Sequence, residues 1–255
     1  MSAARARPRL AVWKLSSCDG CQLALLDCED ELLAVAGAVD IVHFPEATSR
    51  HEDGPYDLSL VEGSITTAHD VEQLRAIRAA SAVLVTIGAC AAAGGVQALR
   101  NARDHAEMLR VVYPRPDDLD SLATSTPVSA HVAVDLELRG CPISKQQLLE
   151  VLGALLHGRR PSLPGHAVCV ECKQRGTPCV TVARGTPCLG PITHAGCGAL
   201  CPTYGRGCFG CFGPSDAPQV PALAELLRAR GAGRDEVERL LSLFHGAAGA
   251  ERKTP

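Results

Sequence analysis

The stretch Cys188-Leu-Gly-Pro-Ile-Thr-His-Ala-Gly-Cys197-Gly-Ala-Leu-Cys201 lies inside a segment, residues 169–211, that holds eight of the thirteen cysteines of the chain. The segment is rich in Gly and Pro and poor in large apolar side chains. It therefore cannot close a hydrophobic core of its own, and either disulfides or metal must hold it together.

The composition of the whole chain favours metal over disulfides. Its 255 residues, 46% of them hydrophobic, suffice for one large domain or two smaller ones with buried cores. The N-terminus has scattered arginines but no signal-peptide pattern, so we expect a cytoplasmic protein with reduced thiols. The chain has no run of about 18 apolar residues, so no membrane span is expected. The formal charge of −3 and the lack of a basic run argue against a nucleic-acid partner.

The first half of the chain alternates between strand and helix patterns. Residues 82–87, rich in Val and Leu and flanked by helical patterns, are typical of a strand in a parallel sheet that is covered on both faces. Residues 101–126 contain a helical start, followed by two prolines and an acidic stretch, and are expected to form an insertion or a partner-facing loop. The predicted strands are 9–15, 39–44, 57–62, 82–87 and 131–138, and the predicted helices are 22–33, 70–80 and 144–156.

Four cysteines recur at the same place in this pattern. Cys18 and Cys21 follow the first predicted strand, Cys90 follows the strand 82–87, and Cys141 follows the last one. The carboxyl ends of parallel strands meet at one edge, where open α/β sheets place their sites. Four thiolates gathered there can ligate zinc or an iron–sulfur cluster. Neighbouring glycines leave room for a bulky inorganic core, which favours the cluster; they are Gly20, Gly88, Gly94, Gly95 and Gly140.

The second half differs in composition. Residues 157–165, rich in Gly, Pro and Arg, predict a linker. We therefore divide the chain into an α/β domain, residues 1–158, and a small irregular Cys-rich domain, residues 159–255. Two terminal helices with Leu faces are predicted at 222–230 and 235–245.

The chain resembles the small, electron-transferring subunit of nickel–iron hydrogenases in four motifs. They are Cys18-Asp-Gly-Cys21, Val61-Glu62-Gly63-Ser64, Gly88-Ala-Cys90 with Gly94-Gly95, and Gly140-Cys141-Pro142. The resemblance implies a flavodoxin-like N-terminal domain. It also implies a proximal 4Fe-4S cluster held by Cys18, Cys21, Cys90 and Cys141.

The Cys-rich half is similar to the cytoplasmic, multimeric branch of that family. By this resemblance a distal 4Fe-4S cluster is held by Cys169, Cys172, Cys179 and Cys188. A medial 4Fe-4S cluster is held by Cys197, Cys201, Cys208 and Cys211. Two positions depart from the periplasmic uptake enzymes: Cys169 stands where they use His, and Cys201 adds a ligand that their three-iron medial centre lacks. Added thiolate charge favours the oxidised cluster and lowers its potential, which suits exchange with a nicotinamide better than delivery to a quinone.

The resemblance also implies partners. The nickel–iron site belongs to a separate large subunit, so no catalytic residue is assigned to this chain. Electrons are expected to pass from the proximal to the medial and distal clusters and then to a diaphorase subunit that binds FAD and NAD(P), with a further iron–sulfur subunit as another candidate partner. The implied member is the delta subunit of the bidirectional NADP-linked or sulfhydrogenase-like group. Glu62 resembles a family position near the proximal cluster, with a role in hydrogen bonding or proton movement.

Other functions fit parts of the same pattern. The same subunit type can pass electrons to a deazaflavin or disulfide-reductase partner. A zinc-stabilised interaction module would pair Cys169-x-x-Cys172 with Cys208-x-x-Cys211, as structural zinc ribbons do. The quinone-reductase subunit of respiratory complex I is disfavoured, because it carries adjacent cysteines in its cluster motif and lacks an eight-cysteine tail. The thirteenth cysteine, Cys28, is expected to be a buried free thiol on the first helix.

Overall fold

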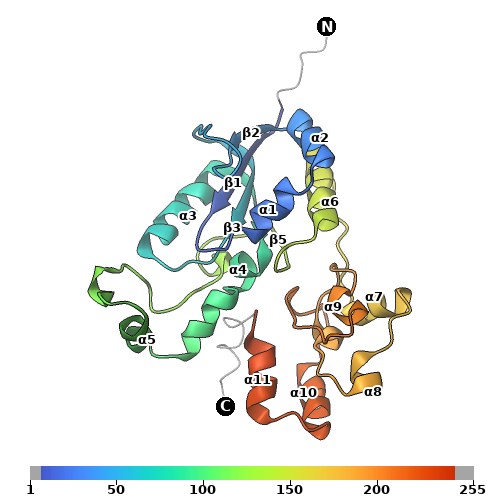
Figure 1. The fold of residues 1–255 in the computed structure, drawn as a ribbon. Helices are drawn as coiled ribbons and strands as arrows, with labels where there is room; N and C mark the ends of the chain where they lie inside the picture. The colour runs from blue at the N-terminus through green and yellow to red at the C-terminus, as the bar shows by residue number, and fades with distance from the viewer. Residues whose placement is uncertain (1–6, 245–255) are drawn as a thin grey trace.

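The structure is a computed structural model, which describes residues 7–244 of the chain. Its N-terminal half contains a five-stranded sheet in which every neighbouring pair of strands is parallel. The strands are β1 (Arg9–Lys14), β2 (Asp40–His43), β3 (Tyr56–Glu62), β4 (Ser81–Ile87) and β5 (Leu136–Leu138), in the order β2-β1-β3-β4-β5. This is the flavodoxin-like order, which places a ligand site at the carboxyl edge of the sheet. The predicted parallel α/β fold is confirmed (Figure 1).

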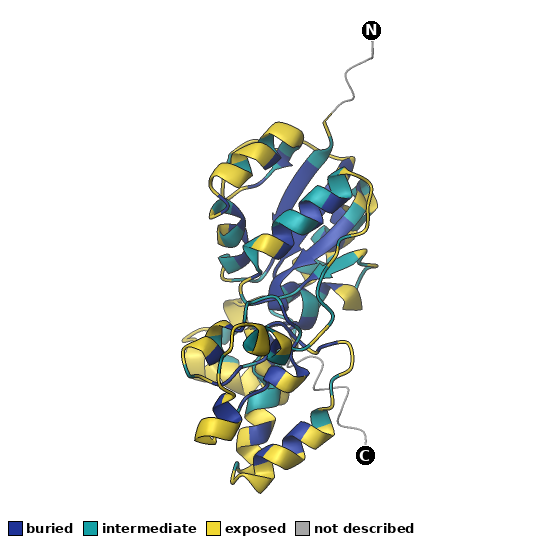
Figure 2. Ribbon diagram, turned by 90° about the vertical axis from the view of Figure 1, so that its right-hand side faces the viewer, coloured by how far each residue is buried: buried dark blue, intermediate teal, exposed yellow. Residues whose placement is uncertain are grey.

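Helices cover both faces of the sheet (Figure 1). One core contains Leu60 and Leu148 and lies under α1 (Gly20–Leu26), α2 (Asp30–Ala38) and α6 (Lys145–Leu156). The other contains Val61 and Leu74 and lies under α3 (Ala68–Ala80). Adjacent residues of β3 thus serve opposite faces, as the pleat of a strand requires. Figure 2 shows the buried residues concentrated in the strands between these helices.

The predicted helix 22–33 is in fact two helices, because the chain turns at Cys28 and Glu29. Glu29 has a φ of 47°, and α2 begins directly after it. One continuous helix would also stack Asp27 against Glu31 four residues on, and like charges at that spacing repel. Cys28 is completely buried in the core as a free thiol, as expected.

The predicted strand 131–138 forms a ladder only over β5. Immediately before β5, the Asp135 carboxylate accepts the Leu84 N–H at 2.7 Å and binds Arg78 at 2.6 Å. The Asp135 side chain therefore takes the place of a backbone acceptor for the Leu84 N–H, and the hydrogen-bonded ladder starts at the next residue, Leu136.

The segment 101–126, expected to be an insertion or loop with a helical start, contains a helix near its beginning. Asp104 caps it by accepting the Glu107 N–H at 2.7 Å. The short elements around it are α4 (Gly88–Ala93), η1 (Val96–Ala102), α5 (His105–Val112), η2 (Pro116–Asp118) and η3 (Val128–Ala130).

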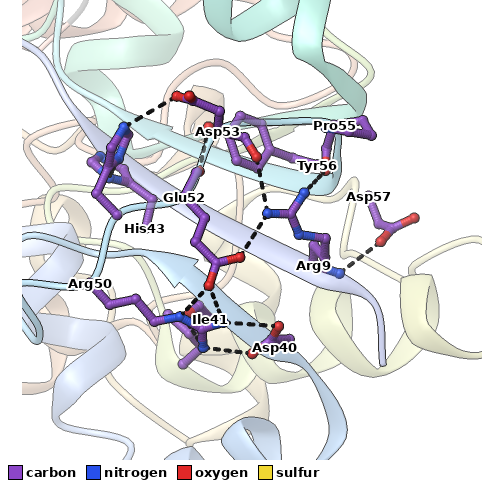
Figure 3. A network of polar contacts seen from close by, with 11 residues as sticks. Arg9, Asp40, Ile41, His43, Arg50, Glu52, Asp53, Pro55, Tyr56 and Asp57 are labelled. Carbon is purple, nitrogen blue, oxygen red and sulfur yellow. Dashed lines mark hydrogen bonds and ion pairs between the residues drawn. The ribbon is translucent and has the colours of Figure 1, made fainter. Parts of the chain in front are cut away.

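A loop over residues 45–55 runs back along the edge strand β2. Arg9 binds Glu52 at 3.1 Å, and Arg50 binds both Glu52 and, at 2.8 Å, Asp40 (Figure 3). Exposed ion pairs contribute little singly. Together these contacts connect β1, β2 and the loop.

The C-terminal half lies beyond the carboxyl edge of the sheet (Figure 1). Residues 159–165 contain neither helix nor strand, in agreement with the predicted linker. Both predicted terminal helices are present, although His245, the last residue of the second prediction, lies outside the described residues. The helices are α7 (Val168–Gln174), α8 (Val180–Arg184), η4 (Gly190–Ile192), α9 (Leu200–Thr203), α10 (Val220–Ala229) and α11 (Arg234–Ser242).

Hydrogen bonds join the two halves. Arg139 donates to the Pro214 carbonyl at 2.8 Å, and Gln147 donates to the Ala195 carbonyl at 3.4 Å. No helix in the described part of the chain combines the length and apolar character that crossing a bilayer demands.

Candidate functional site

The turns that carry the first four cysteines meet at the carboxyl edge of the sheet. A methyl group at Gly88, which has a φ of 89°, would contact Cys21 Sγ, so the end of β4 lies against the start of α1. The Ala89 N–H donates to the Gly140 carbonyl at 2.7 Å, which joins the turns after β4 and β5. A methyl group at Gly20 would lie 3.4 Å from Cys18 Sγ and 3.7 Å from the Cβ of Pro142. The predicted convergence of these turns is therefore present.

The thiols at this edge are close enough to influence one another. Burial, with smaller contributions from Cys141 and Cys18, raises the pKa of Cys90 to about 11. Burial also raises the pKa of Cys141, again with a contribution from Cys18. Burial raises the pKa of Cys21 most strongly, followed by the nearby carboxylate of Glu62. A metal would reverse this preference for the neutral thiol, because a coordinating thiol is deprotonated.

Glu62, the last residue of β3, contacts this site directly. Its side chain is 2% exposed and accepts the backbone N–H groups of Cys21 at 3.1 Å and Gln22 at 3.2 Å. It therefore fixes the first turn of α1, where Cys21 lies.

Two glutamines beside the site were not predicted from the sequence. The Gln22 side chain is completely buried, and neither polar atom of its amide has a hydrogen-bond partner within residues 7–244. The Cys90 thiol donates to Gln97 Oε1 at 3.3 Å, and Gln97 Nε2 donates to the Ser16 carbonyl at 2.9 Å. The only sequence signal for Gln22 is a polar residue next to Cys21 on an otherwise apolar helix.

A second group of thiols surrounds the start of the C-terminal half. Cys169 and Cys172 are three residues apart on α7 and share one side of it. Burial raises the pKa of Cys172 to about 11, followed by the effects of Cys169, Cys188 and Cys179. A methyl group at Gly190 would lie 3.3 Å from Cys188 Sγ and 3.6 Å from Cys169 Sγ. These contacts bring together four of the eight C-terminal cysteines.

We take the other four, the predicted medial ligands, together as a third group. Burial raises the pKa of Cys211 to about 12, with further contributions from Cys197 and Cys201. Burial raises the pKa of Cys208 to about 12 as well, with further contributions from Cys188 of the second group and then from Cys211.

Glu171 holds the loop that carries Cys197. Its carboxylate accepts the N–H groups of Gly196 at 2.9 Å and Ala199 at 3.0 Å. Glu171 was not predicted from the sequence either, because its partners are about 25 residues away along the chain.

Backbone contacts place the three groups in a row. The Cys208 N–H donates to Cys188 Sγ at 3.2 Å and so connects the third group to the second. The Cys141 N–H interacts with the Cys211 sulfur and connects the third group to the one at the sheet edge. The third group therefore lies between the other two.

The residues present fit iron–sulfur clusters. All thirteen cysteines are free thiols, and thiolates are the usual ligands of such clusters. The N–H of Gly190 donates to Cys188 Sγ at 3.4 Å, and N–H···S bonds of this kind tune cluster potentials. Within residues 7–244 no three His, Cys, Asp or Glu side chains are close enough to hold a single metal ion. A four-iron cage is wider than one ion, so that finding concerns single-ion sites alone.

Comparison with known proteins adds to this geometry. Residues 18–155 match the family described as the NADH ubiquinone oxidoreductase 20 kDa subunit. The chain is 38% identical to sulfhydrogenase 2 subunit delta of Pyrococcus furiosus, over 86% of this chain and 92% of that protein. It is 33% identical to a subunit of the F420-non-reducing hydrogenase vhu of Methanocaldococcus jannaschii, over 82% of each. A chain from the crystal structure of an NAD+-reducing [NiFe]-hydrogenase in the H2-reduced state superposes with a TM-score of 0.58 at 34% identity, covering 62% of this chain and 96% of that one.

Proposed function

This chain belongs to the family described as the NADH ubiquinone oxidoreductase 20 kDa subunit and, within it, to the small and delta subunits of hydrogenases, and on that premise we propose that it is the electron-transferring small subunit of a nickel–iron hydrogenase complex. The observation that carries the proposal is the row of three neighbouring thiol groups. When bound there, three 4Fe-4S clusters would each accept and release single electrons.

The proposed ligands follow the three groups. The proximal set lies at the sheet edge, the medial set in the middle, and the distal set at the far end of the row. They are Cys18, Cys21, Cys90 and Cys141; then Cys197, Cys201, Cys208 and Cys211; then Cys169, Cys172, Cys179 and Cys188. The chain positions these sulfurs on short helices and on the turns beside them, and it donates backbone N–H groups to Cys188 and Cys208. We retain the division into domains 1–158 and 159–255 as part of the proposal.

The proposed partners are a large subunit that holds the nickel–iron site and a diaphorase that binds FAD and NAD(P), all in the cytoplasm. Similarity to a chain of an NAD+-reducing [NiFe]-hydrogenase supports the nicotinamide acceptor. The all-thiolate donor sets support it too, because added thiolate charge lowers cluster potentials.

The similarity to a component of an F420-non-reducing hydrogenase supports a second candidate acceptor. In that case the electrons leave to a partner that does not use a nicotinamide, such as a disulfide reductase. The two candidates share every residue role assigned above and differ only in the protein that receives the electrons.

Anaerobic purification of the complex with its partner subunits tests the proposal. Three clusters of four irons predict about twelve iron and twelve sulfide per copy of this chain, brown colour, and visible absorption that bleaches under dihydrogen. Dihydrogen-dependent reduction of NADP+ or NAD+ would distinguish the first acceptor from the second. A colourless complex that contains zinc would refute the proposal and favour the interaction module.

A further inference from the structure

The segment that holds the C-terminal cysteines differs in charge from the chain as a whole. The chain has 25 Lys and Arg against 28 Asp and Glu, whereas residues 168–211 contain four cations and one anion. The anion, Glu171, binds the N–H groups of Gly196 and Ala199 in the Cys197 loop. The exposed charge of this segment therefore comes from the cations alone; they are Lys173, Arg175, Arg184 and Arg206.

The fold gathers these cations on neighbouring elements. The Arg175 guanidinium lies beside Gly198, where an added methyl group would be 2.8 Å from Nη2. The Arg184 guanidinium lies beside Gly205 in the same way, so the end of α8 meets the turn after α9. Arg206 follows that turn. Figure 1 shows α7, α8 and α9 in one lobe. We call the surface formed by Lys173, Arg175, Arg184 and Arg206 the cationic face.

These cations have no acidic partner. All four are exposed, and none forms an ion pair with any residue from 7 to 244, whereas Arg50 and Arg159 in the N-terminal half and linker each bind a carboxylate. An unpaired group of like charges repels itself and attracts a surface of opposite sign.

Exposed apolar side chains lie on the same elements as the cations. Val182 is 74% exposed and Tyr204 is 77% exposed, and they lie on the two elements that Arg184 connects. Arg and Tyr are among the residue types enriched in the centres of protein interfaces. Charge together with apolar area indicates a protein partner more than a small anion.

The cationic face includes residues of the elements that carry one end of the thiol row. Cys179, which belongs to the second group, is an exposed cysteine and lies in sequence between Arg175 and Arg184. A protein bound here would approach the row at Cys179.

We propose that the cationic face docks a redox protein whose own docking surface is acidic. The inference rests on the proposed function, because it assumes that electrons leave at this end of the row. Complementary charge would bring the partner to the exit and orient it there, which raises association rates at low ionic strength.

The test measures binding of an acidic [2Fe–2S] ferredoxin, used as a probe, to the anaerobic complex of this chain with its large subunit, from which the diaphorase has been removed. The salt concentration is raised from about 10 mM to about 150 mM, over which the Debye length falls from about 30 Å to about 8 Å. The double variant Arg175→Glu/Arg184→Glu should bind at least about tenfold more weakly at low salt and lose its salt dependence. The control Arg110→Glu reverses an exposed cation on α5 that forms no ion pair within residues 7–244, and it should bind as the unchanged complex does.

Iron content and the visible spectrum are measured on every sample. If the double variant loses iron, Arg175→Gln/Arg184→Gln replaces it, with an expected smaller weakening in the same direction. Salt-independent binding by the unchanged complex would overturn the inference. A double variant that binds the probe normally but has shifted reduction potentials would overturn it too. In that case the cations would act only by offsetting the negative charge of the cysteine thiolates that ligate the clusters. A complex without iron refutes the proposed function, whereas normal iron with charge-insensitive binding refutes only this inference.

Discussion

The carboxylate of Glu62 accepts the backbone N–H of Cys21 at 3.1 Å, within the buried carboxyl edge of the sheet. The same carboxylate accepts the N–H of Gln22 at 3.2 Å. The last residue of β3 thus holds the first turn of α1 at the distance that places the Cys21 thiol beside Gly88. Glu62 is a positioning residue for Cys21, a more specific role than the sequence indicated.

Replacing Glu62 with Ala should reduce the iron bound at the sheet edge. Two buried N–H groups would lose their acceptor, at a cost of about 1–3 kcal/mol each. Glu62→Gln keeps one acceptor oxygen and should retain more iron than Glu62→Ala. Iron per complex and the electron paramagnetic resonance signal of the reduced complex give the measurement. Glu46→Ala, which removes an exposed carboxylate bound to Lys14, is the control and should change stability by less than about 0.5 kcal/mol. Full iron in Glu62→Ala would contradict the positioning role.

Gly88→Ala should disrupt the same edge from the opposite side. The φ of 89° is strained for any residue with a Cβ, and the added methyl group would collide with Cys21 Sγ. Gly153→Ala is the matched control, because this glycine lies in α6 and nothing is within 4 Å of the added methyl group. We expect Gly88→Ala to lose iron, and Gly153→Ala to raise the melting temperature through about 0.4–1 kcal/mol of added stability. Equal iron in the two variants would show that the turn tolerates a side chain.

The meeting at the sheet edge of the three turns that carry the first four cysteines could be predicted from sequence, since the carboxyl ends of parallel strands share one edge whatever the length of chain between them. The contacts of Gln97 and Glu171 could not be predicted from sequence. Each depends on a partner far away along the chain, and the hydrophobic periodicity of the sequence does not identify such partners. For the same reason the eight C-terminal cysteines could be divided into two sets only by resemblance. The short β5 had no sequence signal either, since the strand is limited by the contact between Asp135 and Leu84.

The contact between His43 and His51 predicts a local response to pH. Their Nδ1 atoms are 2.8 Å apart, and the His43 ring lies 4.0 Å from the Trp13 ring, centroid to centroid. Burial lowers the pKa of His43, and His51 lowers it further. The folded state then binds a proton less readily than the unfolded chain, in which His titrates near 6.5. The contribution of this contact to the free energy of unfolding is therefore fully present above about pH 6.5. It is lost as the pH falls from there toward the lower pKa of His43 in the folded state.

Hydrogen exchange of the Glu52 amide reports on this contact, because that amide donates to the Val42 carbonyl beside it at 3.0 Å. After correction for the intrinsic exchange rate, protection should fall between about pH 7.5 and about pH 5.5. His43→Phe keeps a ring against Trp13 and should remove most of the pH dependence. His69→Gln, which removes an exposed histidine of α3, should leave it unchanged. Equal pH dependence in His43→Phe would assign the effect to another group.

Cys201 distinguishes the all-thiolate medial set from one with three thiolates. It is the second residue of α9, where a missing N–H is tolerated, so Cys201→Pro should preserve the helix. Losing one thiolate removes negative charge that favours the oxidised cluster, and the medial potential should rise while the other two stay the same. Cys28→Ala is the control, because it removes a buried thiol outside all three groups and should change no potential. Redox titration followed by electron paramagnetic resonance measures each potential, and a medial potential unchanged in Cys201→Pro would remove Cys201 from the ligand set.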